Sequence, residues 1–107
     1  MAEVLTSIEE LRGRIDVIDD QLVRLLNVRV ACAVEVGKLK HEAGLPIYQP
    51  EREAQVLNSV RTAATELAGP LTAEAVVRIF ERIIDEARRA ERAASRSGEE
   101  PQPSLDE

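Results

Sequence analysis

The sequence is poor in aromatic residues, histidine and cysteine. Its 107 residues include one Phe, one Tyr, one His, one Cys and no Trp. The core must therefore be built from Leu, Ile, Val and Ala, a composition that favours helices. Cys32 cannot form an internal disulfide, and its place in an apolar helical pattern predicts a small core residue. Because His41 is the single histidine, the chain offers no metal-binding set.

Long apolar runs and an excess of positive charge are also missing. No segment approaches the roughly 20 uncharged apolar residues of a membrane helix. The N-terminus is acidic at Glu3 and lacks the basic region of a secretory signal. We therefore expect a cytoplasmic protein that does not bind membranes. The net charge of −6 argues against a nucleic-acid partner, because phosphates require a basic surface.

The clearest positive feature is an apolar stripe with helical spacing near the N-terminus. Ser7 and Glu10 form a capping box, and no proline follows before Ala43, so we predict one helix over residues 7–43. Such a helix is roughly 55 Å long, whereas a compact chain of this length has a radius of gyration of about 13 Å. We therefore expect an intertwined homodimer in which two long helices pack along their stripes. The stripe consists of Ile8, Leu11, Ile15, Ile18, Leu22 and Leu25.

Two shorter helices are predicted after the long one. Gly44 and Pro46 end the first helix, and Pro50 opens a second that runs over about 50–67. Gly69 and Pro70 break the chain again before a third segment with helical periodicity.

Thr72 is placed to cap this third helix, which we predict over residues 72–94. Beyond it, Ser, Gly, Pro and acidic residues dominate, so 95–107 is predicted to be a disordered acidic tail. The predicted fold is all-α, with three helices in one domain over residues 1–94. The apolar set of the third helix is Val76, Ile79, Phe80, Ile83, Ile84 and Ala87.

Two cations interrupt the apolar stripe. Arg29 follows Leu25 at the same spacing, and Lys40 lies eleven residues further on, roughly 16 Å along the same face. Burying an unpaired cation is costly, so such residues usually have a carboxylate partner or a ligand. Arg29 has the alternatives of reaching water along its stem or pairing with Asp19 or Glu35.

Other charged residues can join these cations. Glu91 stands where the stripe of the third helix, continued from Ala87, requires an apolar residue, although it can equally face water at a helix end. Arg52 lies in the first turn of the second helix. Arg12 lies about 100° around the helix from Arg29 and can complete the other subunit's site in a dimer, or be an ordinary solvated charge. These residues alone predict an anion-binding helical dimer and do not name a reaction.

Four ordered segments resemble a known family. They read LRGRIDVIDDQLVRLLNVR from Leu11, AVEVGKLK from Ala33, PIYQPEREAQVL from Pro46 and GPLTAEAVVRIFERII from Gly69, within residues 8–91. The chain resembles the all-helical AroQ class of chorismate mutases, close to the mutase domain of bacterial chorismate mutase–prephenate dehydratases. The resemblance implies an isomerase that converts chorismate to prephenate in phenylalanine and tyrosine biosynthesis, without a cofactor. No dehydratase segment follows, so we expect a free-standing mutase.

The resemblance also implies roles for individual residues. Arg29 matches the arginine that binds a substrate carboxylate from the same subunit, and Arg12 matches the one that crosses from the partner subunit. Lys40 matches the lysine that hydrogen-bonds the ether oxygen of chorismate. Arg52 and Glu53 match the arginine and glutamate that begin the second helix, where Glu53 would contact the ring hydroxyl.

Three further positions vary within the family pattern. Gln49 stands where Asp is frequent, and Ala87 stands where some members have a Ser that contacts a carboxylate. Glu91 matches a position, Gln or Glu, whose partner is the ether oxygen. Because an ionised carboxylate would repel that oxygen, we expect Glu91 to act protonated, with a pKa raised by burial and opposed by Lys40. The implied catalytic residues are Lys40, Glu91 and Arg29, and the implied substrate-binding residues are Arg12, Arg29, Lys40, Gln49, Arg52, Glu53, Ala87 and Glu91.

Two other functions are compatible with these residues. An isochorismate pyruvate lyase resembles the same fold and also acts on an enolpyruvyl ether, so product analysis separates the two enzymes. A non-catalytic dimerisation or regulatory module is the other alternative, in which Arg29 and Lys40 would only cost stability. Some mutases gain activity by docking on a partner enzyme, so a regulatory enzyme partner is compatible with catalysis.

Overall fold

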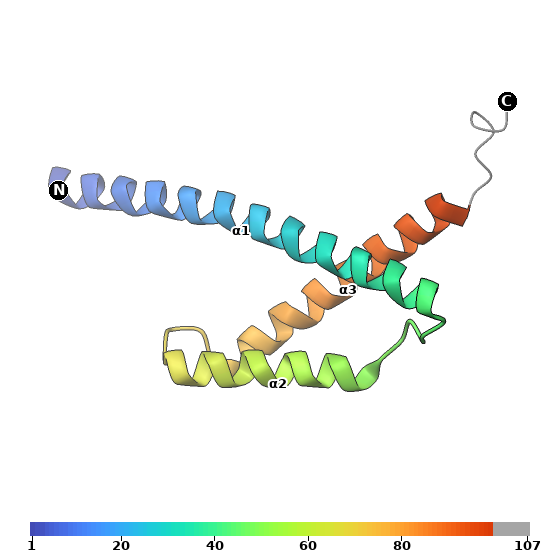
Figure 1. The fold of residues 1–107 in the computed structure, drawn as a ribbon. Helices are drawn as coiled ribbons and strands as arrows, with labels where there is room; N and C mark the ends of the chain where they lie inside the picture. Colours follow the sequence, from blue (N-terminus) through green and yellow to red (C-terminus); the bar gives the residue numbers. More distant parts are fainter. Residues whose placement is uncertain (100–107) are drawn as a thin grey trace, which may run out of the picture.

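Three helices make up the described part of the chain. The structure, a computed structural model, describes the backbone of residues 1–99 and the side chains of residues 1–96. Helix α1 spans Ala2–Ala43, α2 spans Pro50–Leu67 and α3 spans Ala73–Glu99, and there is no strand among these residues (Figure 1). The all-α fold with three helices that the sequence predicts is confirmed.

Helix α1 begins earlier than the sequence predicts. Its N-cap is Met1, and the Leu5 N–H donates to the Met1 carbonyl at 3.1 Å. Ser7 therefore lies inside the helix, where its backbone is not free to cap the first turn, and the predicted capping box is wrong. Residues 2–6 contain neither proline nor glycine, and extending a helix that has already formed is far easier than nucleating one.

The other end of α1 is closed by Gly44. This residue has φ 69° and ψ 25°, a left-handed conformation that glycine adopts without strain. Its N–H donates to the His41 carbonyl at 3.2 Å, and the Leu45 N–H donates to the Lys40 carbonyl at 2.8 Å. This pair of bonds is a Schellman motif. It places the Lys40 side chain in the last turn of α1, where the helix dipole favours a cation.

A short connection joins α2 to α3. Ala68, rather than Gly69, ends α2 in the left-handed conformation, with φ 53°. The Thr72 hydroxyl accepts the Ala75 N–H at 3.1 Å, so the predicted cap of the third helix is confirmed.

Helix α3 extends past the predicted boundary at residue 94. Residues 95–99 are helical, so the prediction of a disordered tail is wrong for these five positions. The physical reason is again helix extension, which needs only one residue to be ordered for each hydrogen bond gained, even for weak helix formers such as Ser and Gly. The rest of the predicted tail, residues 100–107, lies outside the described residues.

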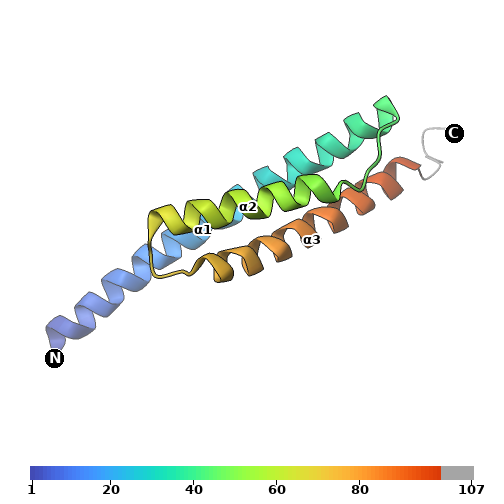
Figure 2. The ribbon, with the colours of Figure 1, turned by 90° about the horizontal axis from the view of Figure 1, so that it is seen from below.

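Helix α3 is the central element. Among the described residues, α1 and α2 each pack on α3 and not on each other. Ala87 of α3, 4% exposed, is the buried centre of this packing. Figures 1 and 2 both show the first turns of α1 projecting beyond the other two helices. The chain is accordingly extended, with a radius of gyration of 19.4 Å, against about 13 Å for a compact chain of this length.

The apolar residues of α1 fall into two groups. Every residue from 2 to 28 is exposed, including the whole predicted stripe. Cys32 and Val36 are exposed as well, so the prediction that Cys32 is a core residue is wrong for the single chain. The reason is that α3 packs on a neighbouring face of the helix. That face is half-buried and consists of Arg29, Val30, Ala33, Val34, Gly37 and Lys40.

Candidate functional site

The candidate site begins with Arg29 on the half-buried face of α1. Its guanidinium lies over the ring of Phe80 in α3, with Cζ 5.8 Å from the ring centroid. At this distance the cation is attracted by the negative face of the aromatic ring. The sequence suggested Asp19 or Glu35 as partners for Arg29, but no carboxylate among residues 1–96 lies within ion-pair distance of it. The donors of the guanidinium are therefore available to an anion.

Lys40 and Glu91 face each other where α1 crosses α3. Gly37, one turn before Lys40, has its side-chain position 3.5 Å from Glu91 Oε2. A side chain larger than hydrogen at residue 37 would therefore contact the carboxylate. Lys40 is half-buried and acts electrostatically on Glu91, without an ion pair among the described side chains. The structure thus brings Arg29, Lys40 and Glu91 to one interface.

The environment of Glu91 favours its neutral form. Burial against α1 raises the pKa of the Glu91 carboxyl above its ordinary value, because a charged carboxylate loses its water there. The positive charges of Lys40, Arg88 and Arg92 lower this pKa and oppose the effect of burial. Both the direction and the opposing effect of Lys40 are those predicted from the sequence.

An ion pair connects α2 to this interface. Arg88 Nη2 donates to Glu53 Oε1, which joins the first turn of α2 to α3. Arg88 Nη1 also donates to Asp85 Oδ1 at 3.0 Å, one turn earlier in α3. The hydrogen bond to Glu53 is the main reason that the pKa of Arg88 is raised. Sequence analysis predicted Glu53 as a site residue but missed Arg88, whose available signal was its position one turn before Glu91.

The remaining predicted residues lie at different depths. Ala87 is buried within α3, and Gln49 is half-buried at the N-cap of α2. Arg52 is exposed, and its Nη1 donates to Gln55 Oε1 of the same helix at 2.6 Å. It lines a shallow hollow at the start of α2 together with Gln49, Glu51 and Gln55. The single chain thus leaves Arg52 turned away from Glu91 and Lys40.

Arg12 is not part of this interface within one chain. It lies 17 residues before Arg29 on the same helix, a separation of roughly 26 Å. Its side chain is 69% exposed and pairs with Glu9 at 3.2 Å. Because both arginines belong to one continuous helix, no bending of the chain brings them together.

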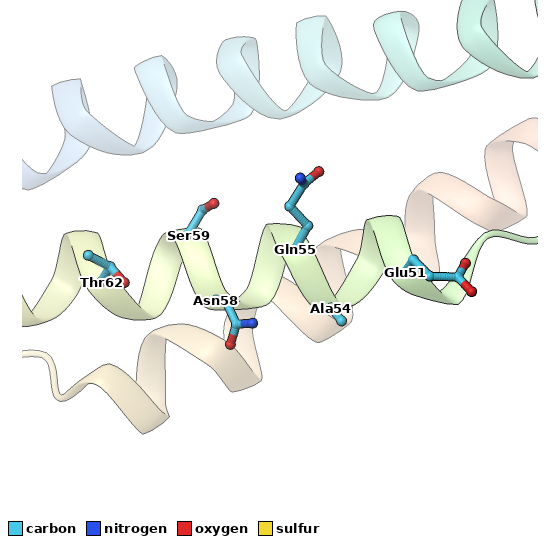
Figure 3. A pocket seen from close by; sticks show the side chains of 6 residues that line it. All are labelled: Glu51, Ala54, Gln55, Asn58, Ser59 and Thr62. Carbon is cyan, nitrogen blue, oxygen red and sulfur yellow. The ribbon is translucent and has the colours of Figure 1, made fainter.

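A second shallow hollow runs along α2 alone. Figure 3 shows Gln55 and Ser59 projecting on the side where α1 lies, while Asn58 projects on the opposite side. No cation lines this hollow, so it is not suited to an anion. Among the described residues, no group of three or more His, Cys, Asp and Glu is placed to hold a metal ion, and no helix is long and apolar enough to cross a membrane. The residues that line the hollow are Glu51, Ala54, Gln55, Asn58, Ser59 and Thr62.

The chemistry available at the interface is anion binding combined with hydrogen-bond donation. Arg29 offers a planar fork that suits a carboxylate, and Lys40 offers a mobile point charge. A neutral Glu91 donates an O–H, which an ionised carboxylate cannot do. No Ser–His or Cys–His pair is formed among the described side chains, since His41 and Cys32 are both exposed on α1. The arrangement therefore favours a reaction that proceeds by positioning and electrostatic stabilisation.

Comparison with known proteins gives consistent matches. The family model described as chorismate mutase type II matches residues 11–92. The bifunctional chorismate mutase/prephenate dehydratase of Aquifex aeolicus is 38% identical over 81 residues, which are 75% of this chain and 22% of that protein. The T-protein of Haemophilus influenzae is 37% identical over 83 residues, 78% of this chain and 22% of that protein. The chain thus spans about a fifth of the length of these two relatives.

A solved structure agrees with these matches. The form II chorismate mutase of Thermus thermophilus superposes with a TM-score of 0.72 and 32% sequence identity. The alignment covers 79% of this chain and 93% of that one. The likeness therefore includes almost the whole of the solved chain.

Proposed function

Because the chain belongs to the chorismate mutase type II family, we propose that it catalyses the rearrangement of chorismate to prephenate. In this reaction the ether C–O bond of chorismate breaks and a new C–C bond forms within the same molecule. Such a step needs no nucleophile and no cofactor. The protein contributes by holding a reactive conformer and by stabilising the negative charge that grows on the ether oxygen.

The observation that carries this proposal is the state of the two cations on α1. Arg29 and Lys40 are half-buried beside α3, and neither has an ion-pair partner among residues 1–96. Keeping two such cations unpaired disfavours folding unless an anion binds there. Chorismate carries two carboxylates and an ether oxygen, which match the donors that this interface presents.

The proposed roles follow from the donors. Arg29 binds one carboxylate of chorismate, while Lys40 donates to the ether oxygen and follows the charge that develops there. Glu91, in its neutral form, donates a second hydrogen bond to the same oxygen. Glu53 accepts a hydrogen bond from the ring hydroxyl.

The residues at the edge of the interface have weaker support. Gln49 and Arg52 lie together at the start of α2, and we propose that Arg52 turns from Gln55 toward the substrate when it binds. Ala87 has no polar side-chain atom, so it can only shape the site. Replacing Ala87 with Ser tests whether a hydroxyl there gains a contact with the substrate carboxylate.

The activity is tested by mixing the purified protein with chorismate and identifying the product by NMR. We expect prephenate, formed at a rate far above the spontaneous rearrangement. Release of pyruvate would indicate a lyase instead. No turnover by a correctly folded protein would contradict the proposed activity and favour a non-catalytic module.

We further propose that the active form is a homodimer. The whole apolar stripe of α1 is exposed in the single chain, with Leu25 65% exposed. Soluble chains rarely leave so long an apolar face uncovered, and a second copy presents the same stripe to it. Arg12, roughly 26 Å from Arg29 on one rigid helix, then reaches a site only from the partner subunit.

Subunit mixing tests this crossing. Arg12→Ala and Arg29→Ala variants are each expected to be nearly inactive. After the two are unfolded, mixed and refolded together, half of the dimers carry one intact site, so about a quarter of the wild-type activity returns. Mixing without recovery, in dimers shown to have exchanged, would mean that Arg12 does not act across the interface.

A partner enzyme is the last part of the proposal. The name of the Aquifex aeolicus relative describes two activities in one chain. This supports a regulatory enzyme partner for the present chain, and adding a purified prephenate-consuming enzyme to the assay tests it. An increase in the initial rate of chorismate consumption is expected, and an unchanged rate would contradict the partnership with that enzyme.

A further inference from the structure

Arg88 stands out because the family resemblance assigns it no role, yet it makes the ion pair between α2 and α3. The other ion pairs of Arg12, Arg24 and Arg82 join residues within a single helix. By contrast, Arg88 and Glu53 are 35 positions apart in sequence and belong to different helices. Their side chains are 37% and 29% exposed, so the pair is partly shielded from water. A shielded pair is screened less by salt than a pair on the surface.

The Arg88 side chain is held at two points. One terminal nitrogen binds Glu53 and the other binds Asp85, at 3.0 Å. A planar guanidinium that binds two carboxylates at once has little freedom to rotate. It therefore fixes the position of Glu53 relative to α3, whose backbone is anchored by the buried Ala87.

The bond to Arg88 leaves Glu53 able to bind a ligand. Arg88 uses Oε1 of Glu53, and a carboxylate has about four acceptor positions on its two oxygens. Glu53 can therefore accept a hydroxyl through Oε2 while Oε1 stays on Arg88. Because Arg88 is one turn before Glu91 in α3, the same helix positions both acidic groups of the interface.

We propose that Arg88 is a positioning residue, which holds the Glu53 carboxylate where it accepts the hydroxyl of the substrate. The proposal rests on the proposed mutase function. Arg88 does not contact the reacting atoms and acts only through Glu53. Its loss should therefore impair catalysis only as far as it misplaces Glu53.

A double-mutant cycle on chorismate turnover tests the proposal. Arg88→Met should lower kcat/KM by about ten- to a hundredfold, the size of loss expected from a misplaced binding group. In the Glu53→Gln background the same change should have almost no further effect, because the group it positions is already altered. Arg88→Lys keeps the charge but not the fork, and should recover part of the loss.

Arg82→Met is the matched control. Arg82 also lies on α3 and pairs with Glu86 at 2.7 Å, but its side chain is 66% exposed and the pair stays within the helix. We expect its kcat/KM to equal that of the wild type. If Arg88→Met does not fold, Asp85→Asn removes the second anchor instead, and a loss of about two- to fivefold that disappears in the Glu53→Gln background is expected.

The outcomes separate this proposal from the one on which it rests. A wild-type protein that does not convert chorismate overturns the proposed function and this inference with it. An active wild type overturns this inference alone if folded Arg88→Met keeps full kcat/KM. The same holds if Arg88→Met loses as much in the Glu53→Gln background as in the wild type.

Discussion

The two halves of α1 are parts of one uninterrupted helix with very different surroundings. Residues 2–28 are exposed on every side, whereas residues 29–40 press one face against α3. The first half carries most of the regular apolar stripe, yet it is the second half that packs within the chain. The second half also contains both unpaired cations, Arg29 and Lys40. Regular apolar spacing therefore marks a face that will be covered but does not say which chain covers it.

The difference also separates two kinds of function along the helix. In the second half, a crossing with α3 brings charged side chains from two helices together, which is how a site is formed. In the first half, an apolar face with no neighbour in the chain is suited to a second copy. Each half can be perturbed separately, so the comparison is open to experiment.

The largest effect is expected at Lys40. Lys40→Ala should lower kcat by about a hundred- to a thousandfold with little change in KM, because its charge acts mainly in the transition state. Arg29→Ala should impair both parameters, since a carboxylate is bound in the ground state as well. Steady-state kinetics with chorismate measures both. Small and equal effects from the two variants would contradict these roles.

The next largest effect is expected from the exposed half. Leu22→Lys places a charge in the stripe of both copies of a dimer, which should weaken association by at least about 3 kcal/mol, or roughly a hundredfold. Light scattering after gel filtration measures the mass against concentration. Asp16→Lys, on the polar side of the same half, is the control and should leave the mass unchanged. An unaltered mass for Leu22→Lys would show that the stripe is not the interface.

A smaller effect is expected from the pH dependence of Glu91. Its pKa is raised above 4.5 by burial, while Lys40 from α1 and Arg88 and Arg92 from α3 oppose the increase. If the neutral acid donates to the ether oxygen, activity falls as pH rises through this raised pKa, by about tenfold per pH unit once the group is ionised.

Variants separate Glu91 from other titrating groups. Glu91→Gln keeps a donor at all pH values, so its profile of kcat/KM should lack the fall. Glu81→Gln, an exposed residue of the same helix, should retain it. A Glu91→Gln profile that matches the wild type would mean that the ionisation of Glu91 does not limit the reaction.

The smallest effect is expected from two glycines, one in each half of α1. Gly13 has nothing within 4 Å of its side-chain position, whereas that of Gly37 lies 3.5 Å from Glu91 Oε2. Alanine at either position should raise the free energy of unfolding by up to about 1 kcal/mol through helix propensity. Denaturant unfolding at equal protein concentration measures this gain.

Only Gly37→Ala should also change the chemistry. Its methyl group would displace water from the Glu91 carboxylate and raise the pKa of Glu91 further. The fall in activity should then move to higher pH, while Gly13→Ala keeps the wild-type profile. Identical profiles for the two variants would show that the crossing does not control the ionisation of Glu91.

Local sequence signals predicted much of the fold. Gly44 ends α1 because a residue without a side chain adopts positive φ most easily, and Thr72 caps α3 because its hydroxyl can accept a backbone N–H. The start of α1 was mispredicted at Ser7 because a capping signal does not prevent a helix from extending backwards. The site was predicted from breaks in periodicity at Arg29, Lys40 and Glu91.

Other features had no local signal. Neither Phe80 as the partner of Arg29 nor Arg88 as the partner of Glu53 was predicted, because both contacts depend on how the helices cross. The exposure of Cys32 was missed for the same reason. A rotation of α1 about its own axis would leave every propensity and cap intact while changing which side chains meet α3.

The sequence by itself determined that this protein is three helices with caps, breaks and cations at definite positions, because these depend on short-range backbone and side-chain preferences. Only the tertiary structure decided that α3 is the central element, that Glu91 loses its water against α1 and that Arg88 binds Glu53. These features arise from packing between residues far apart in the chain. Side-chain spacing along one helix carries no information on the angle at which another helix crosses it.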